Sequence, residues 1–557
     1  MVSLFSSLNI ASNALSVNES AISVVSHNVA NMNTEGYSKQ RVNLATRNIA
    51  GTIGDNVNAQ VRSNGGVMIA NVMRYNNDYL NNYYRTQVSE LNKYQAQLDG
   101  LGDLADVFND LDGEGIDGAL GKFYDSLNNL QEYPASSTAR INFIETAKSL
   151  AAVLNSKSVQ LDQLNSKALG DGESTDALEK SEIFTKIGAF NDKLEELAEV
   201  NKALQVTQTG TLTANNLLDK RDLILNDIAE YIDIQVKENP NGSVTLYSGD
   251  DALVKGSVVT GKLSIEPTKT YCLNNGLTYT PEYWIDAAGN RRTEKAVVSI
   301  VNSSGNVVKG DTNGDITGGS LGGLLHSGDL NADGMNPGKA QAALNLIASE
   351  VADMFNTLNK RENAFYINPN DTSKLYYETD ASGNITNGGN NADIFTTQTG
   401  TGTITAGNIS VNPDLLTDDG CWKIACAYFR DSENFDENAI GNAQNVGNSF
   451  IDPSGNPIGS FLGTRSEKRA NLNGQSLEDY YTGLVGKIAA GGSNAQNMVD
   501  TQQGIVDSLY NQIKSNNSVD LNEELVDLVK YQTAYAVSAQ VFNVVNNCLD
   551  TLMTLGR

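Results

Sequence analysis

The sequence predicts an α+β multidomain protein with terminal coiled-coil helices, an elongated helical-bundle stem and β-rich insertion domains. Heptad stripes at both ends of the chain, long segments of helical period and two Gly/Asn-rich segments with short β-like runs support this fold class. At 557 residues the chain is too long for one hydrophobic core. We therefore expect about three or four domains.

The first stripe lies at the N-terminus and has the spacing of a coiled-coil seam. Its members are Leu4, Leu8, Ala11, Leu15, Asn18, Ile22, Val25, Val29 and Met32. Asn18 is the one polar member, and no Lys or Arg occurs before Lys39. A solvent-exposed helix normally carries a charged face, so this helix is expected to be surrounded.

The second stripe lies at the C-terminus and follows the same rule. Its members are Leu521, Leu525, Leu528, Gln532, Tyr535, Ala539, Phe542, Asn546, Leu549 and Met553. Between Tyr531 and Gly556 only Asp550 is charged. Two such helices have little to fold against in isolation, which favours ordering on assembly. The alternative is that both termini meet in the core of a soluble monomer.

Between the stripes, the period of the apolar residues divides the chain into helical and β-like parts. Strand-like alternation covers 41–75, and helices are expected over 78–98, 123–130, 139–169, 183–207, 215–232, 339–363, 477–488 and 498–513. The predicted division is a terminal coiled-coil domain (1–33 plus 519–557), a helical stem (34–233 plus 319–363 plus 466–518) and β-rich insertions at 234–318 and 364–465. The order predicts a discontinuous stem with both chain ends at its base.

Composition limits the class of partner and the compartment. The formal charge of −27 and the pI near 4.4 argue against nucleic acid or an anionic membrane as partner. We expect no cleaved signal peptide, and no 18-residue apolar run is present. Cys272, Cys421, Cys426 and Cys548 are too scattered for a disulfide framework. Cys421 could pair with Cys426, but free thiols are favoured, as in a cytosolic protein or one exported unfolded.

No catalytic or cofactor motif is found, so the sequence predicts neither an enzyme nor a cofactor or metal. His27 and His326 are the only histidines, and a capping or packing role is favoured for His27. Asp329 to Gly334 matches the start of an EF-hand loop through Asp329, Asn331 and Asp333, but Ala340 replaces the bidentate Glu. An Asx-rich turn is therefore favoured over a calcium site.

Two terminal segments resemble a known family. Residues 26–40, with Asn28, Asn31, Asn33, Thr34, Gly36 and Tyr37, resemble the N-terminal signature of bacterial flagellar rod, hook and hook-associated proteins. Residues 519–528 and the following Tyr531-Gln532, Ala534-Tyr535 and Ala539–Phe542 resemble that family's C-terminal motif. Asp520 and Glu523 also suit a helix-starting capping pair.

Internal segments 215–222, 318–325 and 473–477, together with the length, resemble the first of the two kinds of hook–filament junction protein in that family. The resemblance implies a structural subunit that forms a ring of like subunits on the flagellar hook protein and receives the second junction protein and flagellin. It also implies an extracellular location, unfolded export through the type III channel, a dedicated export chaperone, and assembly through the two stripes. The insertions carry no specific match. A hook or rod subunit, or a glycan-binding or adhesive surface protein, are the alternatives.

Overall fold

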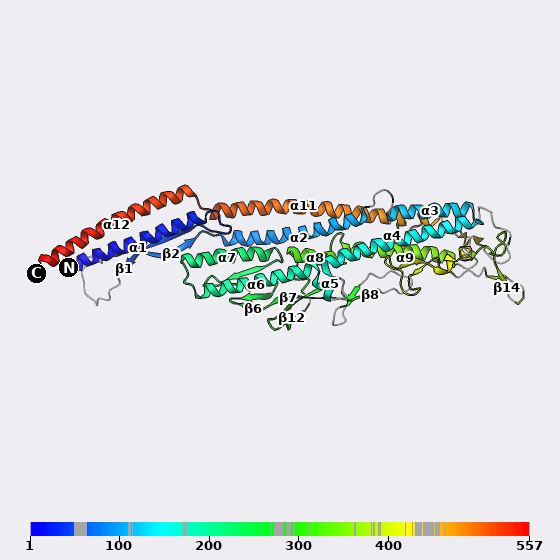
Figure 1. Ribbon diagram of the computed structural model, residues 1–557, viewed down its shortest axis with the longest axis horizontal. Coiled ribbons are helices and arrows are strands. Elements are labelled where there is room, and N and C mark those ends of the chain that lie inside the picture. The colour runs from blue at the N-terminus through cyan, green and yellow to red at the C-terminus, as the bar shows by residue number, and fades with distance from the viewer. Residues whose placement is uncertain are drawn as a thin grey trace.

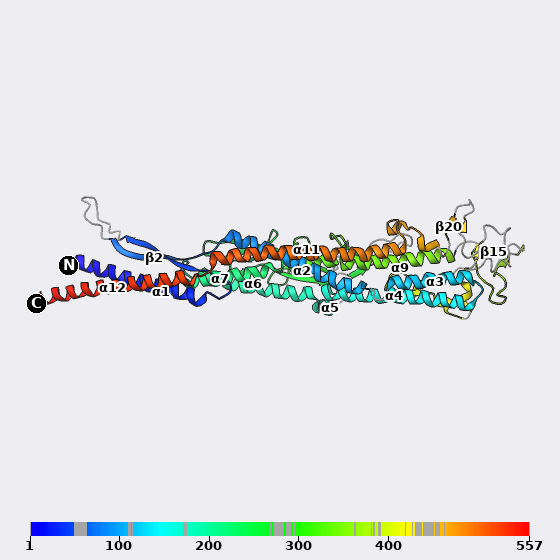
Figure 2. The ribbon, with the colours of Figure 1, turned by 90° about the horizontal axis from the view of Figure 1, so that it is seen from above.

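The chain forms one long rod with both termini at the same end (Figure 1). A computed structural model describes residues 2–48, 64–109, 113, 115–170, 175–267, 269–271, 283–285, 291–292, 296–310, 312–360, 364–379, 381–382, 385–387, 392–417, 419–425, 427–428, 437, 450–451, 457–459, 461 and 463–555. Seen from above, the helices still run along the same long axis (Figure 2). The α+β fold class with long terminal helices and an elongated helical stem is confirmed.

The end that holds the termini is built from two helices and a two-stranded ribbon, which we call the terminal region. Helices α1 (Val2–Asn31) and α12 (Leu521–Leu555) lie side by side, and β1 (Gln40–Asn48) pairs antiparallel with β2 (Asn64–Arg74). Away from the stem, α1 lies between α12 and the ribbon (Figures 1 and 2). Ala21 and Val24 of α1 pack with Val42 of the ribbon, because a two-stranded ribbon needs a helix to cover it.

The stem consists of long helices and short β segments. Its helices are α2 (Asp78–Phe108), α3 (Ile116–Glu132), α4 (Ser137–Leu169), α5 (Thr175–Glu179), α6 (Glu182–Val206), α7 (Leu212–Ala229), α8 (Gly319–Gly328), α9 (Pro337–Asn359) and α11 (Leu477–Asn517). Side-chain oxygens of Ser136, Ser181, Thr211 and Ser476 accept the first free N–H groups of α4, α6, α7 and α11, which fixes where these helices begin.

The first β segment forms three small sheets, of which two pack on α6 and α7. One has the strand order β3-β4-β5-β6, over Gln235–Glu238, Val244–Ser248, Asp251–Lys255 and Val258–Val259. Another has the order β12-β11-β7, over Val307–Lys309, Ala296–Val301 and Lys262–Pro267. The third joins β10 (Arg291–Arg292), β9 (Tyr283–Ile285) and β8 (Lys269–Tyr271).

The second β segment consists of short strand pairs and 3₁₀ turns at the far end of the rod. Its strands are β13 (Ala364–Phe365), β14 (Glu378–Thr379), β15 (Ile385–Asn387), β16 (Phe395–Thr397), β17 (Ile409–Val411), β18 (Ala427–Tyr428), β19 (Phe450–Ile451) and β20 (Pro457–Gly459). Four 3₁₀ turns accompany them in the described part, at Pro413–Leu416, Gly420–Lys423, Gly463–Ser466 and Ala470–Leu472.

Two hydrophobic cores follow one another along the rod. One joins α6, α7 and α8 to the first β segment, with Phe190 and Leu246 fully buried. The other joins α2, α3, α4, α9 and α11 to the second β segment, around Phe123, Phe355 and Phe395. Each β segment therefore shares a core with stem helices. The four-part division of the chain stays a prediction.

Three sequence predictions about helices were wrong. The five-residue helix α5 was not expected. Residues 477–517 form one helix, α11, where two shorter helices were expected on either side of Gly491-Gly492. Gly491 lies against Leu101 of α2, so packing keeps the helix continuous across two poor helix formers. Helix α8 was missed, because four of its ten residues are glycine.

The described helices were also compared with the length and apolar character that a bilayer requires. None of them, within the described residues, is long and apolar enough to cross a membrane. Of the cysteines, Cys421 is buried and Cys548 is exposed and free, whereas Cys272 and Cys426 lie outside the described residues.

Candidate functional site

Three segments that are far apart in the sequence meet where the terminal region joins the stem. They are the turn after α1 (32–39), the beginning of α7 and the beginning of α12, and the ribbon lies among them. All three were singled out by their resemblance to one family. We call this meeting point the joint.

Asn28 lies at the centre of the joint and is 1% exposed. Its Nδ2 donates to the backbone oxygen of Gln40 at 2.8 Å and to Oε2 of Glu524 at 3.0 Å. Its Oδ1 accepts from the backbone N–H of Gln40 at 3.0 Å and from the hydroxyl of Tyr37 at 2.7 Å. Both donors and both lone pairs of the amide are used, so Asn28 fixes α1, the ribbon and α12 relative to one another.

His27 and Tyr37 extend this network to α7. The Tyr37 oxygen lies 3.0 Å from Nδ1 of His27, and Nε2 of His27 lies 3.4 Å from Nδ2 of Asn216. Burial, then the nearby carboxylates of Asp219 and Glu524, raise the pKa of Tyr37 above its ordinary value. The phenol therefore stays protonated as a donor, and His27 has the packing role that was favoured.

Gln40 ties the ribbon to the asparagine pair of α7. Nδ2 of Asn215 donates to Oε1 of Gln40 at 2.9 Å and to the backbone oxygen of Val72 at 3.1 Å. Nε2 of Gln40 in turn donates to Oδ1 of Asn216 at 3.0 Å. Gln40 and Asn215 are buried, whereas Asn216 is exposed, and the pairing removes the cost of burying the first two amides.

A cluster of buried charges completes the stem side of the joint. Arg74 of β2 donates to Asp219 at 3.0 Å and to Asp222 at 2.5 Å. Arg85 of α2 also reaches Asp222, at 3.3 Å, and Arg221 reaches it at 2.9 Å. Charges buried to this degree persist only when they are paired and hydrogen-bonded.

The two aspartates have opposite electrostatic environments. Burial raises the pKa of Asp219 to about 6 and outweighs the opposing effect of Arg74. Burial also opposes the ionisation of Asp222, but the guanidinium groups of Arg74, Arg221 and Arg85 outweigh it and hold the pKa of Asp222 below its ordinary value. Asp222 is therefore a permanent anion, whereas Asp219 is close to titrating.

The beginning of α12 is held by a cation of the turn after α1 and by one of the ribbon. Lys39 lies 2.5 Å from Glu523 and 3.4 Å from Glu524, and Arg41 lies 3.3 Å from Asp527. The backbone N–H of Lys39 donates to the oxygen of Asn517 at 2.9 Å, which fixes the end of α11 as well. Oδ1 of Asp520 accepts from the backbone of Asn522 at 2.8 Å, so Asp520 caps α12 as expected.

The signature turn lies on the surface of the joint. Asn31 donates to the backbone of His27 at 2.9 Å, and Thr34 donates to Asn31 at 3.3 Å. Gly36 has a φ of 73°, which favours glycine, and Asn33 is exposed. This turn, α2, α7 and α11 border a cleft of about 590 Å³.

The predicted stripes are covered to different degrees. On α1, Val25 is buried, Leu4, Leu8, Leu15, Asn18, Ile22 and Val29 are half-buried, and Met32 is exposed. On α12, Leu528, Phe542 and Leu549 are half-buried, whereas Leu521, Leu525, Gln532, Tyr535 and Asn546 are exposed. The half-buried side of α12 includes Tyr531, which packs on the core of the terminal region. The role of both stripes in assembly stays a prediction.

The internal motifs have structural roles in the stem. A Cβ at Gly323 of α8 would lie 2.6 Å from the backbone oxygen of Lys93, so glycine allows α8 to approach α2 closely. Asn473 has a left-handed φ of 56°, and Ser476 caps α11. In these positions the residues set how closely α8 approaches α2 and where α11 begins.

The loop that resembles an EF-hand closes on a lysine. Nζ of Lys339 donates to the backbone oxygens of Ala332 and Gly334, and the backbone N–H of Asn331 donates to Oδ1 of Asp329 at 2.8 Å. The bond from Asn331 to Asp329 is that of an Asx turn, which agrees with the Asx-rich turn favoured from the sequence.

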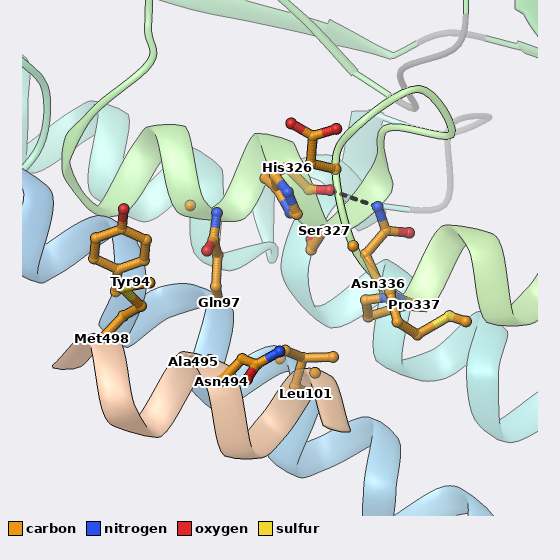
Figure 3. A pocket seen from close by; sticks show the side chains of 16 residues that line it. Tyr94, Gln97, Leu101, His326, Ser327, Asn336, Pro337, Asn494, Ala495 and Met498 are labelled. Atoms are coloured by element: carbon orange, nitrogen blue, oxygen red, sulfur yellow. Dashed lines mark hydrogen bonds between the residues drawn. The ribbon is translucent and has the colours of Figure 1, made fainter. Parts of the chain in front are cut away.

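A cavity of about 200 Å³ lies beside this loop, between α2, α8 and α11 (Figure 3). Tyr94, Gln97 and Met498 line it, and Nδ2 of Asn336 donates to the backbone oxygen of His326 at 3.0 Å at its edge. Burial lowers the pKa of His326, so its imidazole is neutral. The lining is mostly apolar, and nothing in it suggests a reaction.

Sequence reasoning missed the charged residues of the joint. Arg74, Arg85 and Glu524 were not selected, and Asp219 and Asp222 appeared only as letters of a motif. A signal was present in that Arg74 ends an apolar strand and Arg85 lies on the buried side of α2, where an unpaired cation is not tolerated.

Two family models match this chain. The model described as the helical domain of flagellar hook-associated protein FlgK matches residues 101–368, and that described as flagella basal body rod protein matches residues 8–37. The second range includes most of α1 and most of the signature turn. The first covers most of the stem helices and the first β segment.

Curated relatives match over almost the whole chain. Flagellar hook-associated protein 1 of Bacillus subtilis is 25% identical and covers 99% of this chain and 98% of its own length. The proteins of the same name from Salmonella typhimurium and Escherichia coli are 23% and 22% identical, with 98% of this chain and 99% of each relative covered. A solved structure of the flagellar hook junction protein FlgK from Burkholderia pseudomallei has a TM-score of 0.51 at 16% identity and covers 79% of this chain and 100% of its own. That last likeness concerns the fold.

Proposed function

We propose that this chain, which belongs to the family of flagellar hook-associated proteins, is the structural subunit that joins the hook to the filament of the bacterial flagellum. The observation that carries the proposal is the joint, in which the family's terminal motifs and the stem motif of the hook-associated branch close one buried network. Likeness to relatives named flagellar hook-associated protein 1 over nearly the full length supports the same function.

The proposed mechanism is mechanical and involves no catalysis. Several copies form a ring on the distal end of the hook through their terminal regions. The joint transmits the position of each terminal region to its stem, because Asn28 and the ion pairs of Arg74 leave little freedom between the two parts. The far surface of the ring then receives the second junction protein and flagellin.

The proposed location is the extracellular flagellum, reached by unfolded export through the type III channel without a cleaved signal. The free thiol of Cys548 is compatible with the export of an unfolded chain, because Cys548 forms no disulfide that would hinder passage. A dedicated export chaperone would hold the chain until export. Nucleic acid and membrane insertion have no part in this proposal, and no cofactor is required.

The test is electron microscopy of cells that lack the gene, with flagellin measured in the medium. Bare hooks with flagellin shed outside are the expected result. Absent hooks would indicate a hook or rod subunit, and normal filaments would indicate an accessory surface protein. Either of these two results would overturn the proposal.

Complementation with variants tests the role of the stripes. Ile22→Asp and Leu525→Asp place a charge in each stripe and are expected to abolish incorporation, with the stem still folded by circular dichroism. Val206→Asp is the matched control, because Val206 is 85% exposed at the end of α6. Normal incorporation of both stripe variants would contradict the proposed assembly through the terminal helices.

A further inference from the structure

The outer side of α12 carries an apolar stripe that no part of the described chain covers. It consists of Val526, Val529, Val537, Val541, Val544 and Leu552, whose exposed fractions are 67%, 61%, 54%, 47%, 61% and 45%. At about 100° per residue, Val526, Val529, Val537 and Val544 lie on the side of α12 opposite Tyr531, Phe542 and Leu549, which are half-buried, whereas Val541 and Leu552 lie at the edge of that outer side. Exposed Lys530, Thr533 and Gln540 interrupt this surface, but exposed apolar side chains gathered on one side of a helix still mark a site of interaction.

The ribbon carries a second exposed apolar face. Met68, Met73 and Tyr75 are 42%, 51% and 43% exposed. Met73 lies opposite Arg41, whereas the next pair, Val42 and Val72, faces the core with α1. Because side chains alternate along a strand, Met73 and Tyr75 point away from α1.

These two faces lie on different sides of one layer. At the joint, Arg41 of the ribbon reaches Asp527 of α12. Away from the joint, α1 separates α12 from the ribbon, so there the outer stripe of α12 and the outer face of the ribbon lie apart within one chain (Figures 1 and 2). When one surface of a copy binds a different surface of the next copy, the contact is heterologous. Such contacts form closed rings when the rotation between copies allows it.

Charge favours a second copy of this chain as the occupant. The chain has a formal charge of −27, so most of its surface repels another copy. In α12, by contrast, only Asp550 is charged after Lys530, and in α1 only Glu19 is charged. The terminal region is therefore where two acidic copies approach with the least repulsion.

We infer that the outer stripe of α12 in one copy packs on the Met68–Tyr75 face of the ribbon in the next copy. This inference rests on the proposed ring. It assigns the two faces of α12 to two different partners: its inner side contacts α1 of the same chain, and its outer side contacts the ribbon of a neighbour. The contact is head-to-tail, so it extends beyond a dimer.

Paired cysteines test the inference. In a full-length Cys272→Ser, Cys426→Ser, Cys548→Ser background that keeps the buried Cys421, one variant carries Val541→Cys and Met68→Cys together and two variants carry one of them each. Each purified chain is oxidised mildly, with and without isolated hooks, and covalent species are separated by size. The pair is expected to give trimers and larger species, whereas each single variant stays monomeric.

Three results would overturn the inference. Dimers from Val541→Cys alone would show that α12 packs on α12. Absence of a ladder for the pair with and without hooks would exclude the contact. Free reaction of the Val541→Cys variant with a maleimide in hook-bound protein would show that the stripe faces solvent or an open channel. Failure of the proposed function is recognised separately, because electron microscopy would then show no added protein on the hooks.

The folded state of each variant is checked beforehand by circular dichroism and thermal unfolding. A second pair, Val206→Cys with Met68→Cys, is the matched control, since Val206 is 85% exposed but lies on the stem. A ladder from this control pair as large as that from the test pair would also contradict the inference, because cross-linking would then report collision and not a specific contact.

Discussion

Asn28 and Glu524 share a 3.0 Å hydrogen bond although 496 positions separate them along the chain. The bond joins the last turns of α1 to the first turn of α12, inside a network that also includes Gln40 of the ribbon. One amide thus sets the relative position of three elements. The same residues lie in the two motifs that carry the terminal resemblance.

Replacing Asn28 by Ala is expected to loosen the joint. The backbone groups of Gln40 and the carboxylate of Glu524 would lose their partner, at a cost of about 1–3 kcal/mol for a buried polar group left unpaired. Hydrogen exchange of hook-bound protein should rise in residues 37–40 and 521–528. Asn33→Ala, at an exposed position of the same turn, should leave exchange unchanged. Equal exchange in both variants would contradict the role given to Asn28.

Replacing Arg74 by Met is expected to destabilise the stem. Asp219 would lose its ion pair and Asp222 one of its three, and removal of one partner from a buried pair typically costs about 3–5 kcal/mol. Thermal unfolding measures the effect, and Asp219→Asn in the same chain should recover part of it. Lys167→Met, which removes an exposed pair with Asp103, should cost no more than about 1 kcal/mol. A similar loss in both variants would refute the special position of Arg74.

The pH dependence of stability should carry a contribution from Asp219. Its pKa is raised to about 6 from 3.8, so between these values the folded chain binds a proton that the unfolded chain does not. Ionised Asp219 therefore costs stability above pH 6, and the cost disappears as the pH falls towards 4. Asp219→Asn should raise the Tm relative to the original chain more at high pH than at low pH.

Exposed Asn33 provides the control for this experiment, since Asn33→Ala alters no titratable group and should give a Tm difference from the original chain that changes little over the same range. A Tm difference for Asp219→Asn that stays constant across the range would count against the raised pKa. Asp222 has the opposite effect. The folded state favours its ionised form, so the chain should become less stable as the pH falls below about 4 and this carboxylate has to be protonated.

Adding one methyl group at Gly323 is expected to push α8 away from α2. The new Cβ would lie 2.6 Å from the oxygen of Lys93 and 2.7 Å from Cβ of Ala96, and overpacking of this kind costs about 1–3 kcal/mol. Thermal unfolding should show a lower Tm. Gly121→Ala in α3 is the matched control, because no atom lies within 4 Å of its Cβ, and it should stabilise by about 0.5–1 kcal/mol. An unchanged Tm for Gly323→Ala would show that the helices separate easily.

Much of the fold followed from periodicity, because long amphipathic helices have a regular apolar period in the sequence. Helices α4, α6, α7 and the terminal pair were predicted nearly to their ends, whereas α2 extends ten residues beyond its predicted end and α3 begins seven residues before its predicted start. Helix α8 was not predicted, since Gly322 and Gly323 have low helix propensity. Glycine is needed there because neighbouring backbone lies too close for a larger side chain, and the sequence does not reveal those neighbours. Gly491 gave the opposite error, because packing on Leu101 keeps α11 continuous.

Only some residues of the joint could be predicted from the sequence, for a related reason. Asn28 and Tyr37 could be selected by resemblance to a signature, but their partners depend on how the ribbon turns back towards α7. Arg74 and Asp222 are 148 positions apart, and no local pattern reports that they meet. On α12 a simple heptad selects Leu525, which is exposed, whereas Tyr531 on a neighbouring stripe contacts the core.

The joint depends on residues from both ends of the sequence. Asn28 and Lys39 are made early, yet their acceptors Glu523 and Glu524 come near the end of the 557 residues. A chain that stopped short of Glu523 would keep both hydrophobic cores of the stem and still leave Asn28 with an unused donor and Lys39 with no anion. Only a polypeptide synthesised into its last helix can complete the network that holds α1, the ribbon and α12 together.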